Sequence, residues 1–301
     1  MKIVNFGSLN VDHVYRVPHT VLEGETISST GKSEFCGGKG LNQSIAMARA
    51  GLDVYLAGAI GTDGDMLLKA LHSDGIKTEF IQVLDYPGGH TVIQVNEEGQ
   101  NSIIVYSGTN KMLDESYIER VISSFDQGDI LVLQNEINMV GDILRKAKES
   151  GLVTVFNHSP CDADFDSESL EYVNIIVINE IEGHFITGEE DEDAIISNLS
   201  KRYPDMKIVL TLGKKGAVYY DTGKVYKQKA FNADVKAVDT TGAGDTFLGY
   251  FVYGFAKGKH AEDILELASK AAAISVSREG AAVSIPGINE VLAFQEQAGS
   301  A

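Results

Sequence analysis

The sequence predicts an α/β fold: a three-layer, parallel-rich sheet covered by helices on both faces, with a small β-sheet lid. From about residue 114, short apolar runs alternate with amphipathic stretches of helical period. This alternation is typical of a parallel sheet, whose strands are buried on both faces and joined through helices. Near the N-terminus, by contrast, pairs of segments rich in β-formers follow each other without a helix between them, which predicts the second, smaller sheet.

We treat residues 1–301 as a single domain, because no linker, sequence repeat or low-complexity tract interrupts the chain. Residues 2–8 predict a buried strand of the main sheet. The lid strands are inserted at about 11–35 and 90–106, in two pieces far apart in the sequence. The alternative is that they are edge strands of the main sheet. A separate small sheet must bury its apolar face, so we expect it to close over a ligand and to pair with a second copy in a homodimer.

The remaining elements follow from periodicity and turn residues. Between the two lid pieces, a glycine loop at 36–44 leads into a helix that Gly51 ends; a strand at 54–60, a helix at 66–73 and a strand at 77–84 come next. The lid strands are expected at 11–17, 25–35, 90–95 and 102–106. Later helices are expected at 114–125, 140–150, 191–202 and 261–278, and later strands at 130–133, 153–156, 175–178 and 208–212.

Composition excludes several classes of protein. The formal net charge is −18, whereas duplex binding relies on clustered lysine and arginine, so no nucleic-acid partner is expected. The two cysteines, Cys36 and Cys161, are far apart, so neither a disulfide framework nor a structural zinc is predicted, and a reducing cytoplasm fits. No signal-peptide core or membrane-length apolar run is present, and we expect no membrane partner.

The stretch from Val238 to Phe247 (VDTTGAGDTF) carries the most chemistry. Gly242, Ala243 and Gly244 are expected in the first turn of a helix, where backbone N–H groups are free to meet an anion. Asp245 would repel a phosphate, which makes sense if it takes the proton from a hydroxyl that attacks the phosphorus. The alternative is that Asp245 only stabilises the helix N-terminus, as aspartate often does.

Polar residues follow several predicted strands, and the carboxyl ends of parallel strands share one crevice. They are Asn10, Asp12, Glu136, Asn157, Asn179, Glu182, Thr211 and Gly213. Two nucleotide motifs are excluded. Gly31-Lys32-Ser33 lacks the upstream P-loop glycine, since position 26 is threonine, and Gly242-Ala243-Gly244 has Phe247 where the dinucleotide fingerprint has its third glycine.

Two motifs together resemble the signatures of the ribokinase-like (phosphofructokinase B type) carbohydrate kinases. The first is Gly37-Gly38-Lys39-Gly40-x-Asn42-Gln43, and the second runs from Asp239 to Phe247. The resemblance covers essentially the whole chain in the family's order. It implies an ATP-dependent sugar kinase, with D-ribose as the leading substrate and phosphoryl transfer in line to the terminal hydroxyl.

The resemblance also implies a role for each matching residue. Asp245 would be the general base, with the amides of Gly242, Ala243 and Gly244 as an anion hole. The sugar would be bound by Asn10, Asp12, Gly38, Lys39, Asn42 and Glu136. Asn179 and Glu182 would lie near the phosphates and Mg²⁺, through ordered waters, and Thr211 and Gly213 would border the nucleotide. A loop for a monovalent cation, K⁺, would comprise Asp239, Thr241, Ser275, Arg278, Gly280 and Ser284.

Each of these residues also has a purely structural interpretation: Asp12 as a strand-end turn residue, Glu182 as a first-turn helix acid and Thr241 as an N-cap. The chain also departs from the family pattern at residues 157–160 (NHSP for the usual Asn-Pro-Ala-Pro), at Thr109 and at Asn135. These departures leave other sugars and nucleosides open as substrates. A non-catalytic sugar-binding protein is the alternative outside the enzymes, although a binder has no need of a base.

Overall fold

A nine-stranded sheet forms the centre of the protein in the computed structural model, which describes residues 1–162, 165–231 and 237–295. The strand order is β13-β12-β11-β10-β9-β8-β1-β4-β5. All neighbours from β11 to β5 pair in parallel, whereas β12 and β13 pair antiparallel. The strands are β1 (Ile3–Phe6), β4 (Val54–Gly61), β5 (Lys77–Leu84), β8 (Ile130–Gln134), β9 (Val153–Asn157), β10 (Ile175–Asn179), β11 (Lys207–Thr211), β12 (Ala217–Asp221) and β13 (Lys224–Gln228).

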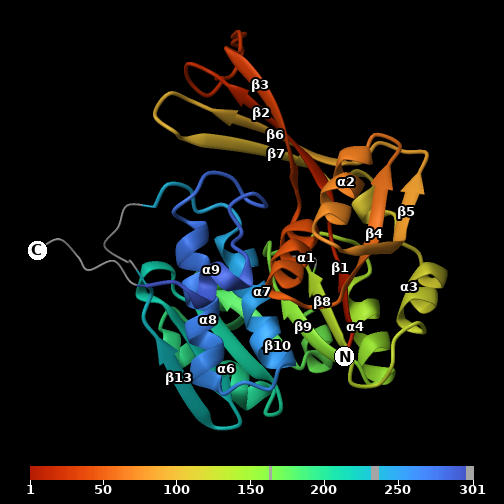
Figure 1. Ribbon diagram of the computed structural model, residues 1–301, viewed down its shortest axis with the longest axis vertical. Coiled ribbons are helices and arrows are strands. Elements are labelled where there is room, and N and C mark those ends of the chain that lie inside the picture. Colours follow the sequence, from red (N-terminus) through yellow and green to blue (C-terminus); the bar gives the residue numbers. More distant parts are fainter. Residues whose placement is uncertain (163–164, 232–236, 296–301) are drawn as a thin grey trace, which may run out of the picture.

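Helices cover both faces of this sheet, as Figure 1 shows. They are α1 (Lys39–Ala50), α2 (Asp65–Ser73), α3 (Glu115–Ile122), α4 (Val140–Glu149), α5 (Glu180–Thr187), α6 (Glu192–Arg202), α7 (Ala243–Ala256), α8 (Ala261–Ser275) and α9 (Ile288–Leu292). Side chains of β1 alternate between two cores: Ile3 packs with α1, α7 and α8, whereas Val4 and Phe6 pack with α3, α4 and α6. Successive residues of a strand point to opposite faces, so both faces need an apolar cover.

A separate four-stranded sheet projects from one end of the body (Figure 1). Its order is β3-β2-β6-β7, built from β2 (Asn10–Arg16), β3 (Gly31–Gly37), β6 (Gly89–Val95) and β7 (Asn101–Tyr106). The predicted α/β class with a small second sheet is therefore confirmed. Only three residues separate β1 from β2, so the small sheet begins directly at the carboxyl edge of the main one.

Several element boundaries were wrong. Residues 25–30 form no strand, because β3 begins only at Gly31; the predicted glycine loop is also short, since Gly37 ends β3 and Lys39 begins α1. The last long helix ends at Ser275 rather than at 278, and the antiparallel hairpin of β12 and β13 was missed. Its strands, AVYYD and KVYKQ, are only five residues long and show no regular alternation of polar and apolar residues, so they carry a weak strand signal.

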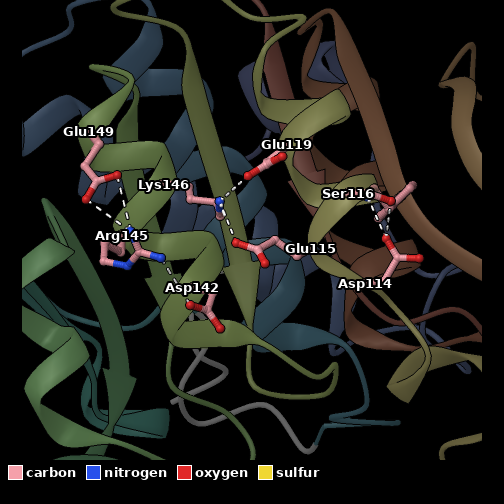
Figure 2. Close-up of polar contacts among 9 residues, drawn as sticks. Asp114, Glu115, Ser116, Glu119, Asp142, Arg145, Lys146 and Glu149 are labelled. Carbon is pink, nitrogen blue, oxygen red and sulfur yellow. Dashed lines mark hydrogen bonds and ion pairs between the residues drawn. The ribbon is translucent and has the colours of Figure 1, made fainter.

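On the surface of α3 and α4, six charged side chains form what we call the charged cluster: Glu115, Glu119, Asp142, Arg145, Lys146 and Glu149. Lys146 lies 3.1 Å from Glu115 and 2.7 Å from Glu119, and Arg145 pairs with residues of its own helix (Figure 2). In the described ranges, no helix has the length and apolar character needed to cross a membrane.

Candidate active site

The turn before α7 has the geometry expected of an anion site. Gly242 is the N-cap, in the left-handed region with φ 75°, and a Cβ on it would lie 3.1 Å from the Cα of Ala281. Glycine satisfies both constraints. Among the described residues, the N–H groups of Gly242 and Gly244 have no acceptor, while that of Ala243 makes a long 3.3 Å bond to Thr240. The helix begins one residue later than a Thr241 N-cap would require.

Asp245 lies in the first turn of α7 and is 6% exposed. Two amide side chains of α1 donate to it: Asn42 Nδ2 at 3.2 Å to Oδ2 and Gln43 Nε2 at 2.9 Å to Oδ1. Gly249 allows this approach of α1 to α7, because a Cβ there would lie 2.4 Å from the Cβ of Ala46. The structure thus brings residues of the two glycine motifs into direct contact.

Lys39 lies at the first position of α1 and is the cation that three carboxylates of this site share. Burial by itself lowers the pKa of Lys39, but Asp245, Glu136 and Glu182 together raise it above the usual lysine value. The ammonium group is therefore retained in a partly buried place, where it balances the carboxylates around it.

Two further carboxylates meet where the small sheet joins the body. Glu136 follows β8 and accepts from the hydroxyl of Ser8 and from the backbone N–H of Lys39, the latter at 3.1 Å. Asp12 on β2 accepts from Thr91 Oγ1 at 2.6 Å. Burial raises the pKa of Asp12 against this hydrogen bond, and the charge of Glu136 adds to the rise. The two acids thus interact across the junction.

Asn10 and Gly38 complete this end of the site. Asn10 is 5% exposed, and its Oδ1 accepts from Asn110 Nδ2 at 2.7 Å. Gly38 is the N-cap of α1, with φ 93°, and a Cβ on it would lie 2.8 Å from the carbonyl oxygen of Ser8. Any larger residue at position 38 would push the start of α1 away from the β1–β2 junction.

Asn179 and Glu182 form a capping box at the start of α5. Asn179 Oδ1 accepts from the N–H of Glu182 and Glu182 Oε2 accepts from the N–H of Asn179, both at 2.9 Å. The structural interpretation of Glu182 as a helix acid is therefore correct, but the capping box uses only one carboxylate oxygen. A hydrogen bond from Ser159 and the charge of Lys39 favour the ionised form of this carboxylate. Burial raises the pKa of Glu182 despite these contacts.

A cavity of about 280 Å³ opens beside the turn of Gly242. It brings Thr211 and Gly213, at the end of β11, together with the start of α7. Its lining includes Thr211, Gly213, Thr240, Gly244, Phe247 and Ala272. Most of these groups are small or apolar, and Phe247 offers an aromatic ring, so the cavity suits a flat, partly apolar group attached to an anion.

Asp239 joins the turn before α7 to the loop after α8. Its carboxylate accepts from the N–H of Thr241 at 2.9 Å and from the N–H of Gly280 at 2.9 Å. Burial opposes ionisation, but these hydrogen bonds lower the pKa of Asp239. In the described part of the chain, the carbonyl oxygens of Asp239, Thr241, Arg278 and Gly280 accept no hydrogen bond.

The other residues of the predicted cation loop lie close by. Ser275 and Ser284 are hydrogen-bonded to each other through their hydroxyls at 2.8 Å, and Thr246 Oγ1 contacts Ser275 Oγ at 3.4 Å. The Arg278 side chain turns outward to Glu290 at 2.5 Å, so only its backbone faces the loop. The carbonyl oxygens of this loop that accept no hydrogen bond are available as ligands for a hard cation.

The residues at which the chain departs from the family pattern are occupied by internal bonds. Thr109 Oγ1 donates to the carbonyl of Ala59 at 3.0 Å, and Asn135 Nδ2 donates to the carbonyl of Pro160 at 2.9 Å. Two of the departures, Asn135 and the segment 157–160, therefore contact each other. The single hydroxyl proton of Thr109 is used by Ala59, so Thr109 has no donor left for a ligand in the crevice.

Sequence reasoning missed Gln43, Gln134, Asn5 and Ser159 as parts of the site. Gln43 lies inside the first motif, directly after the predicted site residue Asn42. This position was the signal that could have identified it. Gln134 and Asn5 lie within apolar strands, where a single buried amide attracts no notice without knowledge of its neighbours.

Comparisons with known proteins agree with this geometry. The family model for the pfkB family of carbohydrate kinases matches residues 1–288. A ribokinase of Haemophilus influenzae is 36% identical over 301 residues, covering 97% of each chain. A structure of Arabidopsis thaliana ribokinase complexed with ribose and ATP is 30% identical, with a TM-score of 0.87 and 97% of both chains covered.

Ribokinase from Cryptococcus neoformans in complex with ADP is 34% identical, with a TM-score of 0.83, over 97% of this chain and 99% of that one. The family match and these likenesses extend along nearly the whole chain, including both glycine motifs and the small sheet. The protein is therefore a phosphotransferase with an alcohol acceptor, and it belongs to the pfkB family of carbohydrate kinases.

Proposed function

We propose that this kinase uses ATP to phosphorylate D-ribose on its terminal hydroxyl, giving D-ribose 5-phosphate. The observation that carries the proposal is the placement of Asp245. It is a buried carboxylate in the same helical turn as the free amides of Gly242 and Gly244, beside a cavity that suits a nucleotide base. A kinase requires a general base next to the site that holds the transferred phosphoryl group.

In the proposed reaction, the terminal hydroxyl oxygen of the sugar attacks the γ-phosphorus while Asp245 takes its proton. The bond from that phosphorus to the oxygen of the departing ADP breaks in line with the attack. The amides of Gly242, Ala243 and Gly244 stabilise the charge on the transferred group, as donors fixed in advance do most effectively. Lys39, already held among carboxylates, adds a positive charge.

The sugar would lie between the small sheet and the main sheet, bound by Asn10, Asp12, Gly38, Lys39, Asn42 and Glu136. Carboxylates and amides accept from and donate to several hydroxyls at once. Asn42 Oδ1 supports this role, because it is buried and has no hydrogen-bond partner among the described residues. A sugar hydroxyl would satisfy it.

ATP would occupy the cavity, with its base near Thr211 and Gly213 and its phosphates toward Gly244. Asn179 and Glu182 would hold Mg²⁺ through water, and their capping box leaves only part of the Glu182 carboxylate for that purpose. When bound, Mg²⁺ supplies charge neutralisation of the phosphates. K⁺ would bind the free carbonyls around Asp239 and Gly280 and order the turn that begins α7.

D-ribose is favoured over other sugars by the names of the relatives, and the departures at Thr109 and Asn135 do not count against it. Both side chains bond to backbone carbonyls, so neither alters the hydroxyl-binding residues. Another sugar or a nucleoside remains the alternative substrate. A sugar-binding protein without turnover is the alternative outside the enzymes.

We propose a homodimer through the small sheets. Phe35, Ile103 and Val105 share the face of Asp12 by register and are 47%, 52% and 61% exposed. A row of exposed apolar side chains on one face is typical of a surface that pairs with another copy. Light scattering at micromolar concentration should give twice the mass of 32.4 kDa; a monomer would refute this.

The function is tested by ADP release from MgATP with D-ribose, ketoses, deoxy sugars and nucleosides, each in K⁺ or Na⁺. Turnover that depends on ribose and is larger in K⁺ supports both substrate and cation loop. Turnover with another compound alone would change the assigned substrate but leave the proposed mechanism intact. Sugar binding by calorimetry without any turnover would favour the binding protein.

A further inference from the structure

A chain of amide side chains lies behind Asp245: the buried Asn5, Gln43 and Gln134 and the half-buried Asn157, here called the amide network. We propose that Gln134 is a positioning residue that acts through Gln43, keeping an amide N–H rather than an amide carbonyl directed at the Asp245 carboxylate. The proposal rests on the proposed role of Asp245 as the base. Gln134 itself makes no hydrogen bond to Asp245.

One arm of the network begins at a backbone carbonyl. Asn5 Nδ2 donates to the oxygen of Gly40 at 2.9 Å, and a carbonyl can only accept, so Asn5 must present its own Oδ1 on the other side. Gln134 Nε2 donates to that Oδ1 at 2.8 Å and to Gln43 Oε1 at 2.7 Å. Gln134 thereby fixes which end of the Gln43 amide faces it.

The other arm gives the same answer from a second carbonyl. Asn157 Nδ2 donates to the oxygen of Val177 at 3.0 Å, which leaves Asn157 Oδ1 to accept from Gln43 Nε2 at 3.1 Å. The same Nε2 donates to Asp245 Oδ1 at 2.9 Å. Both arms therefore set one orientation of Gln43, with its two N–H bonds on Asn157 and Asp245.

Reversal of Gln43 would place its Oε1 against the Asp245 carboxylate and its N–H groups against those of Gln134. Asn5, Gln43 and Gln134 are 0% exposed, so water is not available to relieve either clash, and facing acceptors in a dry site are costly. The side chains that contact the carboxylate are the amides of Gln43 and Asn42, and Lys39 is the charged group that interacts with it.

Gln134 shows that this orientation is specific. Its Oε1 is buried and has no partner within the described ranges, in the space next to Gly7, where a Cβ would lie 2.3 Å away. Turning the Gln134 amide around would direct this oxygen at the acceptors of Asn5 and Gln43 instead. One unsatisfied oxygen is thus accepted so that both N–H groups of Gln134 can donate.

A double-mutant cycle in turnover tests the proposal. Gln43→Met should lower kcat about 30-fold and Gln134→Met about 10-fold, as expected when a catalytic group is misplaced. KM for ribose and ATP should change less than about threefold, since the lost contact orients the base rather than the substrate. The double variant should be no slower than Gln43→Met, because without Gln43 nothing remains for Gln134 to orient.

The matched control is Thr154→Val, which removes a buried hydroxyl of β9 that donates to Tyr172 at 2.7 Å. It should lower the melting temperature without changing kcat. If Gln134→Met does not fold, Asn157→Ala enters the same cycle from the other arm. Suppose that Asp245→Asn is inactive. The positioning role of Gln134 is then overturned if the losses of the two single variants multiply in the double variant, or if kcat is unchanged in Gln134→Met. An active Asp245→Asn would instead overturn the proposed base, and with it the positioning role of Gln134.

Discussion

The charged cluster on α3 and α4 and the amide network behind Asp245 have hydrogen bonds of similar length but different consequences. In the charged cluster, Lys146 lies 2.7 Å from Glu119 and 3.1 Å from Glu115 (Figure 2), and those two acids are 60% and 66% exposed. In the amide network, bonds of 2.7 to 3.1 Å join Gln43 to its partners, and Asn5, Gln43 and Gln134 are fully buried. Bond length alone therefore does not tell which contacts matter.

Redundancy accounts for the difference. Lys146 keeps a second acid if one is lost, and water replaces either, so each exposed pair is worth about 0 to 1 kcal/mol. Each N–H of Gln43 has one acceptor and no substitute. Substitutions in the charged cluster should hence change stability and turnover very little, whereas substitutions in the amide network should lower stability, turnover or both.

The largest effect is expected from Asp245→Asn, which keeps the shape of the side chain but removes the base. The value of kcat should fall by a factor of about 10³ to 10⁴, within the range of general base catalysis. ADP release measures it, and circular dichroism checks that the variant is folded. Activity within tenfold of the wild type would contradict the assigned role.

A pair of glycine variants separates stability from activity at the anion turn. A Cβ on Gly244 meets no protein atom within 4 Å, so Gly244→Ala should keep or raise the melting temperature, since alanine favours a helix. It should nonetheless lower kcat/KM for ATP about 100-fold, because the methyl group occupies the space of the phosphoryl group.

Gly242→Ala is the counterpart at the neighbouring position. With φ 75° and Ala281 at 3.1 Å, it should destabilise the fold by about 1 to 3 kcal/mol. Thermal unfolding monitored by circular dichroism distinguishes the two variants. An equal loss of stability in both variants would contradict the left-handed conformation of Gly242 and the open space beside Gly244.

The sequence was sufficient for the architecture because the central strands of the main sheet, β8 to β11, are largely apolar and are separated by helices. Asp245, Gly242 and Gly244 could be singled out from the sequence because they lie together in one motif, and their roles are those proposed above. The start of the small sheet's second strand was misplaced, since residues 25–30 carry β-formers but have no partner strand. Pairing is decided by residues distant in the sequence, and local propensity does not contain it.

Gln134 and Asn5 could not be predicted for a related reason. Each is a single polar residue in an apolar strand, and its meaning depends on neighbours 91 and 39 positions away in Gln43 and Ser44. Hydrogen-bond direction in the amide network is fixed by the backbone carbonyls of Gly40 and Val177, and those carbonyls belong to the fold rather than to any motif.

A smaller effect, on stability alone, is expected at His158, which lies in the loop between the network residue Asn157 and Ser159. Its ring is buried beside Phe156 and Phe165, and in the described ranges neither ring nitrogen has a hydrogen-bond partner. Burial lowers the pKa of His158 below its usual 6.5, against the influence of Asp162.

The folded state therefore favours neutral His158, and the stability linked to it is present above pH 6.5 and lost as the pH falls below that value. His158→Phe should remove this loss, so its melting temperature should exceed that of the wild type by more at pH 5 than at pH 8. A difference that does not change with pH would mean that the ring is not the titrating group.

The smallest effect is expected from Lys146→Ala in the charged cluster. The variant loses both acid partners at once, yet the acids are well exposed and become hydrated, so the free energy of unfolding should change by no more than about 1 kcal/mol. Because the pairs are partly screened by salt, even this change should shrink when unfolding is measured in 0.5 M rather than 0.05 M salt, that is, at about a tenfold higher ionic strength. Turnover should match the wild type. A loss comparable to that of Gln134→Met in either measurement would remove the distinction between the two regions, because it would mean that solvent-exposed ion pairs constrain this fold as strongly as the buried amides do.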